Sequence, residues 1–335
     1  MKALVLKQYG GLKNIVFADI PQPVCRHDEI LIQVHAAGLN PVDNMIATGS
    51  FKPIIHLQLP ITLGSDIAGV VVGVGSRVTR FKLGDSVFTS TFDMGMGACA
   101  EYAVVPERIA ALKPTNLDFA QAASIPMVGL TSWQALVDRA NVQPGEKVFI
   151  PAGSGGVGSF AIQLSKHLGA KVGTTTSTIN VDLVRSLGAD EVIDYQKQQF
   201  EELLRGYDVV LGTLRGDAIE KSLQILKPDS SVISLVGPPD VAFARARGMN
   251  FLMRFVFGLL SRKIIGRASK RRIGYSFLFV QPDGEQLTKI AELLQTGIIR
   301  PVIDKAFPFE NAKEALAYLE TGRAKGKVVV QIGVS

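Results

Sequence analysis

The chain has 335 residues, of which 47% are hydrophobic and 20% are charged, a composition that is typical of a folded globular protein and excludes a disordered one. Its length favours two domains, and its only two cysteines, Cys25 and Cys99, exclude a disulfide framework and a cysteine-rich zinc site. The net charge of +6 is local, because nine Lys and Arg and no acid lie between Arg245 and Arg272.

The N-terminal third is predicted to be mostly β. Residues 1–7 contain an apolar run that is too short for a signal peptide, and we predict a strand there. Because no run of about 18 apolar residues is present, we expect no membrane span and a cytoplasmic protein. Further strands are predicted at residues 30–35, 68–75 and 100–105, separated by Gly and Pro.

From residue 119 onward, strand and helix patterns alternate, which predicts a doubly wound parallel sheet and an α/β fold. The predicted strands are 147–150, 171–176, 191–193, 208–212 and 231–236, and the predicted helices are 159–168, 181–187 and 218–226. After an apolar strand pattern at 277–280 and a helix at 285–294, a last strand is predicted at 327–332. We expect this tail to rejoin the first domain.

A glycine-rich turn joins the first strand of this alternating region to its first helix. Gly153, Gly155 and Gly158 satisfy the pattern G-x-G-x-x-G. Without side chains, the backbone can turn tightly and approach a pyrophosphate, while the helix N-terminus presents free N–H groups and the positive end of its dipole. The turn therefore predicts a dinucleotide site.

The end of the second strand in this region bears on the choice between NAD and NADP. An NAD site usually has Asp or Glu there to bind the ribose hydroxyls, but no acid occurs before Asp182. Ser177, Thr178 and Asn180 can instead donate hydrogen bonds to a 2′-phosphate, although Ser and Thr also simply suit the end of a strand. We favour NADPH as the cofactor.

The segment 249–272 is predicted to be an amphipathic helix, with apolar residues near i, i+4 and i+8, followed by a basic cluster. These residues are Phe251, Leu252, Phe255, Leu259 and Leu260. We interpret the segment as a helix that packs on the cofactor domain or lines the substrate entrance, with its Arg side chains solvated. Binding to a membrane surface and binding to nucleic acid are the alternatives.

Several stretches together resemble the zinc-independent, quinone-oxidoreductase-like branch of the medium-chain dehydrogenase/reductase (MDR) superfamily. In chain order they are AGLNPVD (37–43), LGSDIAGVV (63–71), GDSV (84–87), GLTSWQAL (129–136), SGGVG (154–158), GADEVIDY (188–195) and the tail 322–330. The resemblance covers essentially the whole chain. It implies a mostly β GroES-like catalytic domain, residues 1–121 and 281–335, and a Rossmann dinucleotide-binding domain, residues 122–280.

The resemblance also implies contacts with the cofactor. Thr131 would approach the nicotinamide and Tyr195 the adenosine end. Lys325 or Arg323 would supply the positive charge that Asn180 lacks. Together with the glycine turn and the end of the second strand, the expected cofactor-binding residues are Thr131, Gly153, Ser154, Gly155, Gly156, Val157, Ser177, Asn180, Tyr195, Phe277, Phe279 and Lys325.

No metal is expected. In zinc-dependent relatives the positions of Asn40 and Ser65 hold a Cys and a His ligand, and neither residue here offers a thiolate or an imidazole. Alcohol oxidation assisted by a Lewis acid is therefore disfavoured.

The expected activity is an NADPH-dependent, zinc-free transfer of hydride to quinones or α,β-unsaturated carbonyl compounds by a homodimer. Asn40 is the expected polar group at the reacting end, or else only a turn residue before Pro41, and Asp43 is expected to support the loop geometry. Two alternatives stay open. One is a dinucleotide-binding protein that acts by associating with RNA or an anionic membrane, and the other is a zinc-free alcohol or ketone dehydrogenase.

Overall fold

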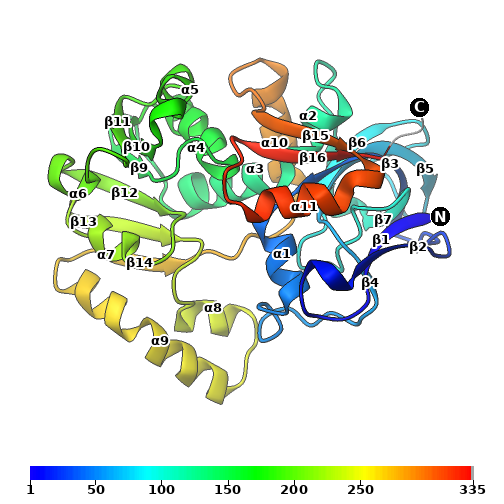
Figure 1. Cartoon of the computed structure of the whole chain (residues 1–335), viewed down its shortest axis with the longest axis horizontal. Coiled ribbons are helices and arrows are strands. Elements are labelled where there is room, and N and C mark those ends of the chain that lie inside the picture. Colours follow the sequence, from blue (N-terminus) through cyan, green and yellow to red (C-terminus); the bar gives the residue numbers. More distant parts are fainter. Residues whose placement is uncertain (333–335) are drawn as a thin grey trace. The chain divides into compact units, whose positions relative to one another are not determined.

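A computed structural model describes residues 1–332, which divide into two compact units (Figure 1). The first unit contains Met1–Leu130 and the chain from Gln281 onward, and the second is Thr131–Val280. The chain first changes unit inside helix α3 (Pro126–Trp133), downstream of the boundary placed after residue 121 from the sequence.

The second unit is built on a parallel sheet of six strands in the order β11-β10-β9-β12-β13-β14. In chain order these strands are β9 (Lys147–Ile150), β10 (Lys171–Thr176), β11 (Glu191–Asp194), β12 (Tyr207–Gly212), β13 (Leu226–Ser234) and β14 (Gly274–Phe277). Numbered within the sheet, the order is 3-2-1-4-5-6, that of a doubly wound dinucleotide-binding fold. The predicted α/β class is therefore confirmed.

The helices of this unit differ from prediction at several ends. They are α4 (Gly156–His167), α5 (Val181–Ser186), α6 (Phe200–Leu203), α7 (Ala218–Ser222), α8 (Val241–Ala246) and α9 (Phe251–Ser269), with a π-helical segment at Gln134–Arg139. The helix predicted at 218–226 is wrong beyond Ser222, because Leu226 already begins β13. The strand predicted at 277–280 ends at Phe277, so Phe279 lies outside it.

The core of the second unit lies between the sheet and the helices beside it. Phe149, Tyr207 and Val232 from the strands pack with Ile264 and Ala268 from α9. A Cβ on Gly173 would lie 2.0 Å from the Tyr207 hydroxyl oxygen, so the ring of that tyrosine fills the space that a larger residue in β10 would need.

Helix α9 packs on the cofactor unit as predicted, but not through the five apolar residues that the sequence indicated. Phe251, Leu252, Phe255, Leu259 and Leu260 are between 55% and 83% exposed. The buried stripe of the helix is instead formed by Phe257, Ser261, Ile264 and Ala268. Within residues 1–332, no helix combines the length and the apolar content that crossing a membrane requires.

The first unit contains the mostly antiparallel, GroES-like sheet that the sequence predicts. The strands of its larger sheet are β3 (Glu29–Leu39), β5 (Asp66–Val74), β6 (Ser86–Ser90), β7 (Tyr102–Pro106), β8 (Ala110–Leu112), β15 (Ile303–Pro308) and β16 (Lys327–Gln331). A smaller sheet joins β1 (Lys2–Leu6), β2 (Ile15–Asp19) and β4 (Ile61–Thr62). The helices are α1 (Pro41–Thr48), α2 (Phe119–Ala123), α10 (Gly284–Gln295) and α11 (Ala312–Glu320).

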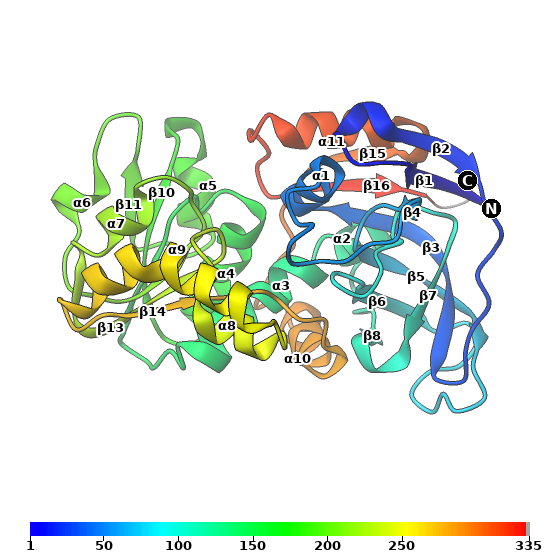
Figure 2. The ribbon, with the colours of Figure 1, turned by 90° about the horizontal axis from the view of Figure 1, so that it is seen from below.

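The C-terminal tail is part of this larger sheet. β16 pairs antiparallel with β3, and β3 pairs antiparallel with β5, so the three strands are neighbours (Figure 2). The C-terminal end of β3 therefore lies beside the starts of both β5 and β16. Residues that are far apart in the chain therefore meet at these strand ends.

Candidate active site

The glycine turn forms a cradle between β9 and α4. The amide of Gly153 donates to the Thr175 carbonyl over 2.9 Å, and the amide of Gly155 donates to the Ala152 carbonyl over 3.0 Å. Ala152 has a φ of 55°, in the left-handed region that residues other than Gly rarely adopt. Because α4 begins at Gly156, the first N–H groups of the helix have no acceptor within it and point outward from its N-terminus.

The three glycines of the motif have different surroundings. A Cβ on Gly153 would lie 2.1 Å from the Thr174 hydroxyl, and one on Gly158 would lie 2.4 Å from the Ala152 carbonyl. A Cβ on Gly155 would meet only the Ala152 carbonyl, at 3.4 Å. Gly153 and Gly158 are thus required by close packing within the fold, whereas the space over Gly155 is left open by the protein. This is the arrangement that lets a diphosphate approach the backbone.

Polar side chains gather beside the cradle, where β10 ends. The Thr176 hydroxyl lies 3.0 Å from the Ser154 hydroxyl. The Asn180 amide donates to Ser154 over 3.3 Å and to Ser177 over 3.2 Å. The structure therefore brings together Ser154, Ser177 and Asn180, three residues predicted from the sequence, in a group of hydroxyls and an amide.

A carboxylate at the end of the neighbouring strand was missed by the sequence reasoning. Asp194 is paired in register with Thr176, and the Thr178 hydroxyl donates to it over 2.5 Å. The hydrogen bond from Thr178, first among several contacts, holds the pKa of Asp194 below its usual range. Its neighbour Tyr195 is 61% exposed at the same edge.

The other predicted cofactor contacts belong to other elements of the chain. Phe277 and Phe279 are buried, and the Phe277 carbonyl already accepts a hydrogen bond from Arg139 over 2.7 Å. Thr131 is buried in α3. Lys325 belongs to the first unit, in the loop between α11 and β16.

In the first unit, Asn40 and Asp43 lie at the N-terminus of α1. Asn40 precedes Pro41 at the first helical position, and its backbone N–H donates to the Asp43 carboxylate over 2.7 Å. This contact ties Asp43 to the turn that leads into α1. Burial raises the pKa of Asp43 to about 7, and its second carboxylate oxygen has no hydrogen-bond partner among the described residues.

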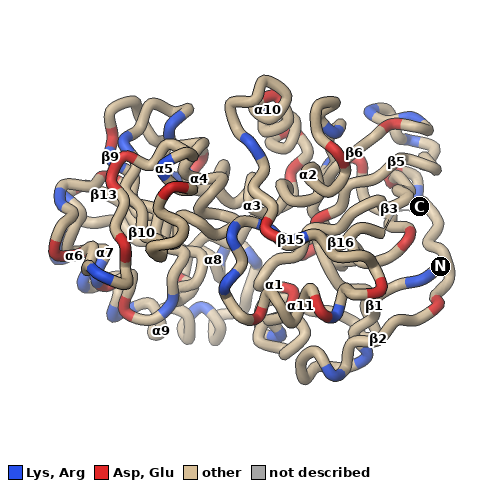
Figure 3. Tube along the Cα trace, turned by 45° about the horizontal axis from the view of Figure 1, so that its top comes forward, with Lys and Arg blue, Asp and Glu red and all other residues tan. Residues whose placement is uncertain are grey.

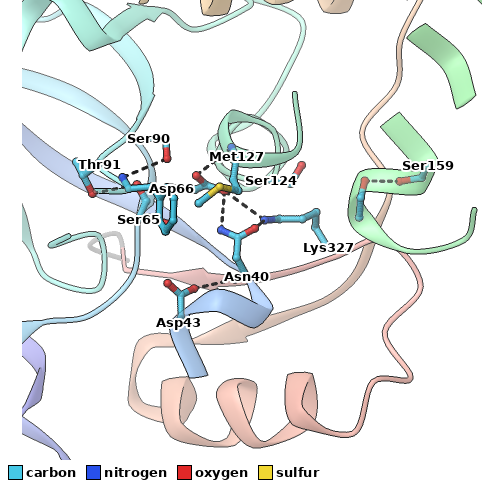
Figure 4. Close-up of polar contacts among 12 residues, drawn as sticks. Asn40, Asp43, Ser65, Asp66, Ser90, Thr91, Ser124, Met127, Ser159 and Lys327 are labelled. Carbon is cyan, nitrogen blue, oxygen red and sulfur yellow. Dashed lines mark hydrogen bonds and ion pairs between the residues drawn. The ribbon is translucent and has the colours of Figure 1, made fainter. Parts of the chain in front are cut away.

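The Asn40 side chain is held by two residues that the sequence did not single out (Figure 4). Its amide donates to Asp66 over 2.9 Å, and its oxygen accepts a hydrogen bond from the Lys327 ammonium. Lys327 also lies 3.2 Å from Asp66, whose other oxygen accepts from the Met127 amide over 3.0 Å. The Lys327 and Asp66 side chains are 5% and 0% exposed.

Electrostatics bind this triad of Asn40, Asp66 and Lys327 together. Burial raises the pKa of Asp66, while the Lys327 ammonium and the Asn40 amide act to lower it. The triad leaves Asn40 with one amide hydrogen that none of its partners accepts. It can therefore act as a hydrogen-bond donor with a fixed orientation.

No metal-binding group is found in the described part of the chain, where no three His, Cys, Asp or Glu side chains are arranged to hold an ion. The Ser65 hydroxyl is buried without a hydrogen-bond partner among those residues, close to the triad (Figure 4).

Comparisons with known proteins agree with this architecture. Residues 26–115 match the family model described as alcohol dehydrogenase GroES-like domain, and residues 187–330 match the one described as zinc-binding dehydrogenase. The chain is 37% identical over 344 residues to NADPH-dependent alkenal/one oxidoreductase, chloroplastic, from Arabidopsis thaliana, covering 98% of this chain and 79% of that protein. It is 33% identical to the mitochondrial NAD(P)H oxidoreductase RTN4IP1 of Mus musculus, covering 99% and 89% of the two chains.

Among solved structures, the quinone oxidoreductase from Coxiella burnetii matches with a TM-score of 0.85 and 32% identity, over 99% of both chains. Fold, sheet order, glycine cradle and full-length similarity all point to the same assignment. The chain belongs to the quinone-oxidoreductase-like branch of the medium-chain dehydrogenase/reductase superfamily.

Proposed function

We propose that this protein is an NADPH-dependent reductase that transfers hydride to quinones or α,β-unsaturated carbonyl compounds. The observation that carries the proposal is the open backbone at Gly155, between two glycines whose Cβ positions are blocked by the fold. Relatives named for alkenal/one and quinone reduction support the substrate class.

The residues present fit the cofactor. The free N–H groups at the start of α4 would hold the pyrophosphate, and the dipole of the helix favours its negative charge. The Ser177 hydroxyl accepts a hydrogen bond from Asn180, so its own hydrogen would be available to the 2′-phosphate, and the Asn180 amide beside it adds no negative charge that would repel that group. Asp194 lies nearby, but its carboxylate already accepts hydrogen bonds from Thr178 and from the Gln196 amide, so it is less available to a ribose hydroxyl.

When bound, NADPH supplies a hydride to an electron-poor carbon of the acceptor. The part that we assign to Asn40 is to donate its remaining amide hydrogen to the acceptor oxygen, where negative charge collects. Lys327 on the Asn40 oxygen polarises the amide and strengthens that donor, and Asp66 fixes its direction. A final proton would come from solvent.

The same triad supports a reaction without zinc. The Lys327 ammonium already supplies positive charge between Asn40 and Asp66, and a divalent cation there would be repelled by it. Ser65, at the position where zinc-dependent relatives hold a His ligand, offers only a hydroxyl.

The cofactor assignment is tested by Gly155→Ala, which should keep the fold because a Cβ there meets the protein only at 3.4 Å. We expect an unchanged melting temperature and a Kd for NADPH at least tenfold higher, measured by calorimetric titration. Gly266→Ala is the matched control, since a Cβ at Gly266 meets nothing within 4 Å and lies outside the cradle. If Gly155→Ala binds NADPH as tightly as wild type does, the glycine turn is not the pyrophosphate site.

The activity is tested by following NADPH absorbance with a panel of quinones and enones. Consumption with at least one class is expected, and no consumption with either would refute the reductase. The second candidate, a zinc-free alcohol or ketone dehydrogenase, is favoured by the descriptions of the matching family models and by a solved structure described as an NAD-dependent alcohol dehydrogenase, which is 28% identical to this chain. Oxidation of an alcohol panel with NADP⁺, with no quinone or enone turnover, would support it instead.

We further propose a cytoplasmic homodimer. Both cysteines are free thiols, as a reducing compartment would leave them, and β14 forms an edge of the six-stranded sheet to which a second copy could add. Light scattering distinguishes a dimer from a monomer.

A further inference from the structure

Helix α9 has a continuous apolar surface that nothing in the described chain covers. Its first half exposes Phe251, Leu252, Phe255, Val256, Leu259 and Leu260, each by more than a third. They recur at i, i+1, i+4, i+5, i+8 and i+9, which places them on one side of the helix, opposite the buried Phe257 and Ile264. A contiguous patch of this kind marks an interaction surface, in contrast to single exposed apolar residues.

The same side of the helix becomes basic in its second half. Arg262, Lys263, Arg267 and Lys270 are exposed there, and the sequence has no Asp or Glu between Asp240 and Asp283. Figure 3 shows blue segments along α9.

Some of these cations are already paired within the unit. Glu220 pairs with Lys263 and Arg267, and Asp229 pairs with Arg272. Arg262 and Lys270 are exposed and take part in no ion pair among the described residues. A partner can therefore contact Arg262 and Lys270 without first breaking an ion pair within the protein.

We propose that α9 binds the surface of an anionic lipid bilayer. The apolar first half would enter the boundary between headgroups and acyl chains, and the cations of the second half would contact lipid phosphates. An anionic bilayer offers hydrocarbon just below its headgroups for the apolar half and negative phosphates at its surface for the basic half.

Other occupants match the surface less well. A second copy of α9 would bring apolar side chains but no acid to oppose the cations, because the segment contains none. A nucleic acid would neutralise the cations but leave six apolar side chains in water. Helix α9 packs beside β14 through its buried residues, while Phe251, Phe255 and Leu259 are exposed.

The test is co-sedimentation of the full-length protein with large unilamellar vesicles. Vesicles of phosphatidylcholine with about 30% phosphatidylglycerol should bind the protein at least tenfold more strongly than pure phosphatidylcholine, and about 0.5 M salt should weaken the binding. Phe255→Ser/Leu259→Ser and Arg262→Gln/Lys270→Gln should each reduce binding at least tenfold. None of these residues belongs to the cradle or the triad, so NADPH binding should be unchanged.

Two controls match the double variants. Val24→Ser/Leu83→Ser removes exposed apolar side chains, and Lys7→Gln/Lys313→Gln removes exposed cations, all in the first unit. Both should bind vesicles like wild type. The proposal is overturned by absence of binding to the anionic vesicles, or by equal binding of all variants. It is also overturned if Phe255→Ser/Leu259→Ser only dissociates a dimer in sedimentation velocity, or if RNA is retained where vesicles are not.

Discussion

Replacing Lys327 by Met tests whether the buried triad is held by charge. Met keeps most of the length of the side chain but removes the ammonium that contacts Asp66 and Asn40. Asp66, which is fully buried, then keeps its carboxylate without a cation, and the Asn40 oxygen loses its donor. Breaking a buried ion pair by removing one partner typically destabilises a protein by about 3–5 kcal/mol.

Thermal unfolding at pH 7 measures this loss. For a unit of about this size, 1 kcal/mol corresponds to roughly 2–4 °C, so we expect the first unit to melt roughly 6–20 °C lower. The double variant Lys327→Met/Asp66→Asn should recover part of the loss, because it removes the uncompensated charge and keeps an acceptor for the Met127 amide.

Lys166→Met is the matched control for a surface pair. Lys166 and Asp190 are joined over 2.9 Å, but their side chains are 35% and 41% exposed, so the loss should stay below about 1 kcal/mol. The reasoning fails if Lys327→Met melts as close to wild type as this control does, or if the double variant is less stable than Lys327→Met alone.

Three further predictions follow from single residues. Burial raises the pKa of Asp43 from 3.8 to about 7, so the folded state binds the Asp43 proton more tightly than the unfolded state does. Between pH 4 and 8 wild type should therefore lose up to about 4 kcal/mol of stability that Asp43→Asn does not lose. Chemical denaturation at each pH measures the difference, and parallel stability curves of the two proteins would contradict the prediction. Asn180→Asp should lower the ratio of kcat/KM for NADPH over NADH at least tenfold through repulsion of the 2′-phosphate, and an unchanged ratio would remove Asn180 from the phosphate site. Gly173→Ala should destabilise the second unit by about 1–3 kcal/mol, because its Cβ would lie 2.0 Å from the Tyr207 hydroxyl; Gly266→Ala, in open space, should not.

The parts of the site that depend on local spacing could be predicted from the sequence. Gly153, Gly155 and Gly158 lie within six positions, and their roles follow from one strand-turn-helix unit. Lys327 and Asp66 are 261 positions apart and meet only because β16 and β5 both pair with β3. A buried lysine beside an aspartate has no signature in either stretch taken alone.

The buried face of α9 was predicted wrongly for a different reason. Its first half has apolar residues on both sides, Phe257 on the buried side and Phe255 and Leu259 on the exposed side. Periodicity identifies a helix with apolar stripes, but it does not tell which stripe faces the sheet when two are present. The distinction requires knowing that Ile264 and Ala268 continue the Phe257 stripe into the core.

Strand direction explains why the triad forms where it does. Leu39 ends β3 opposite Val328, and Gly38 lies opposite Asp66, so the antiparallel pairings deliver Asn40, Asp66 and Lys327 to one edge of the sheet. Because side chains alternate between faces, a slip of β16 by one residue would turn Lys327 away from Asp66 and leave the carboxylate buried and unpaired. The ion pair therefore fixes the register of the closing strand as well as the direction of the Asn40 amide. Lys327, which supplies the positive charge of the proposed donor site, also binds the C-terminal strand β16 to the sheet through Asp66. Correct pairing of β16 and correct orientation of the Asn40 amide therefore arise together.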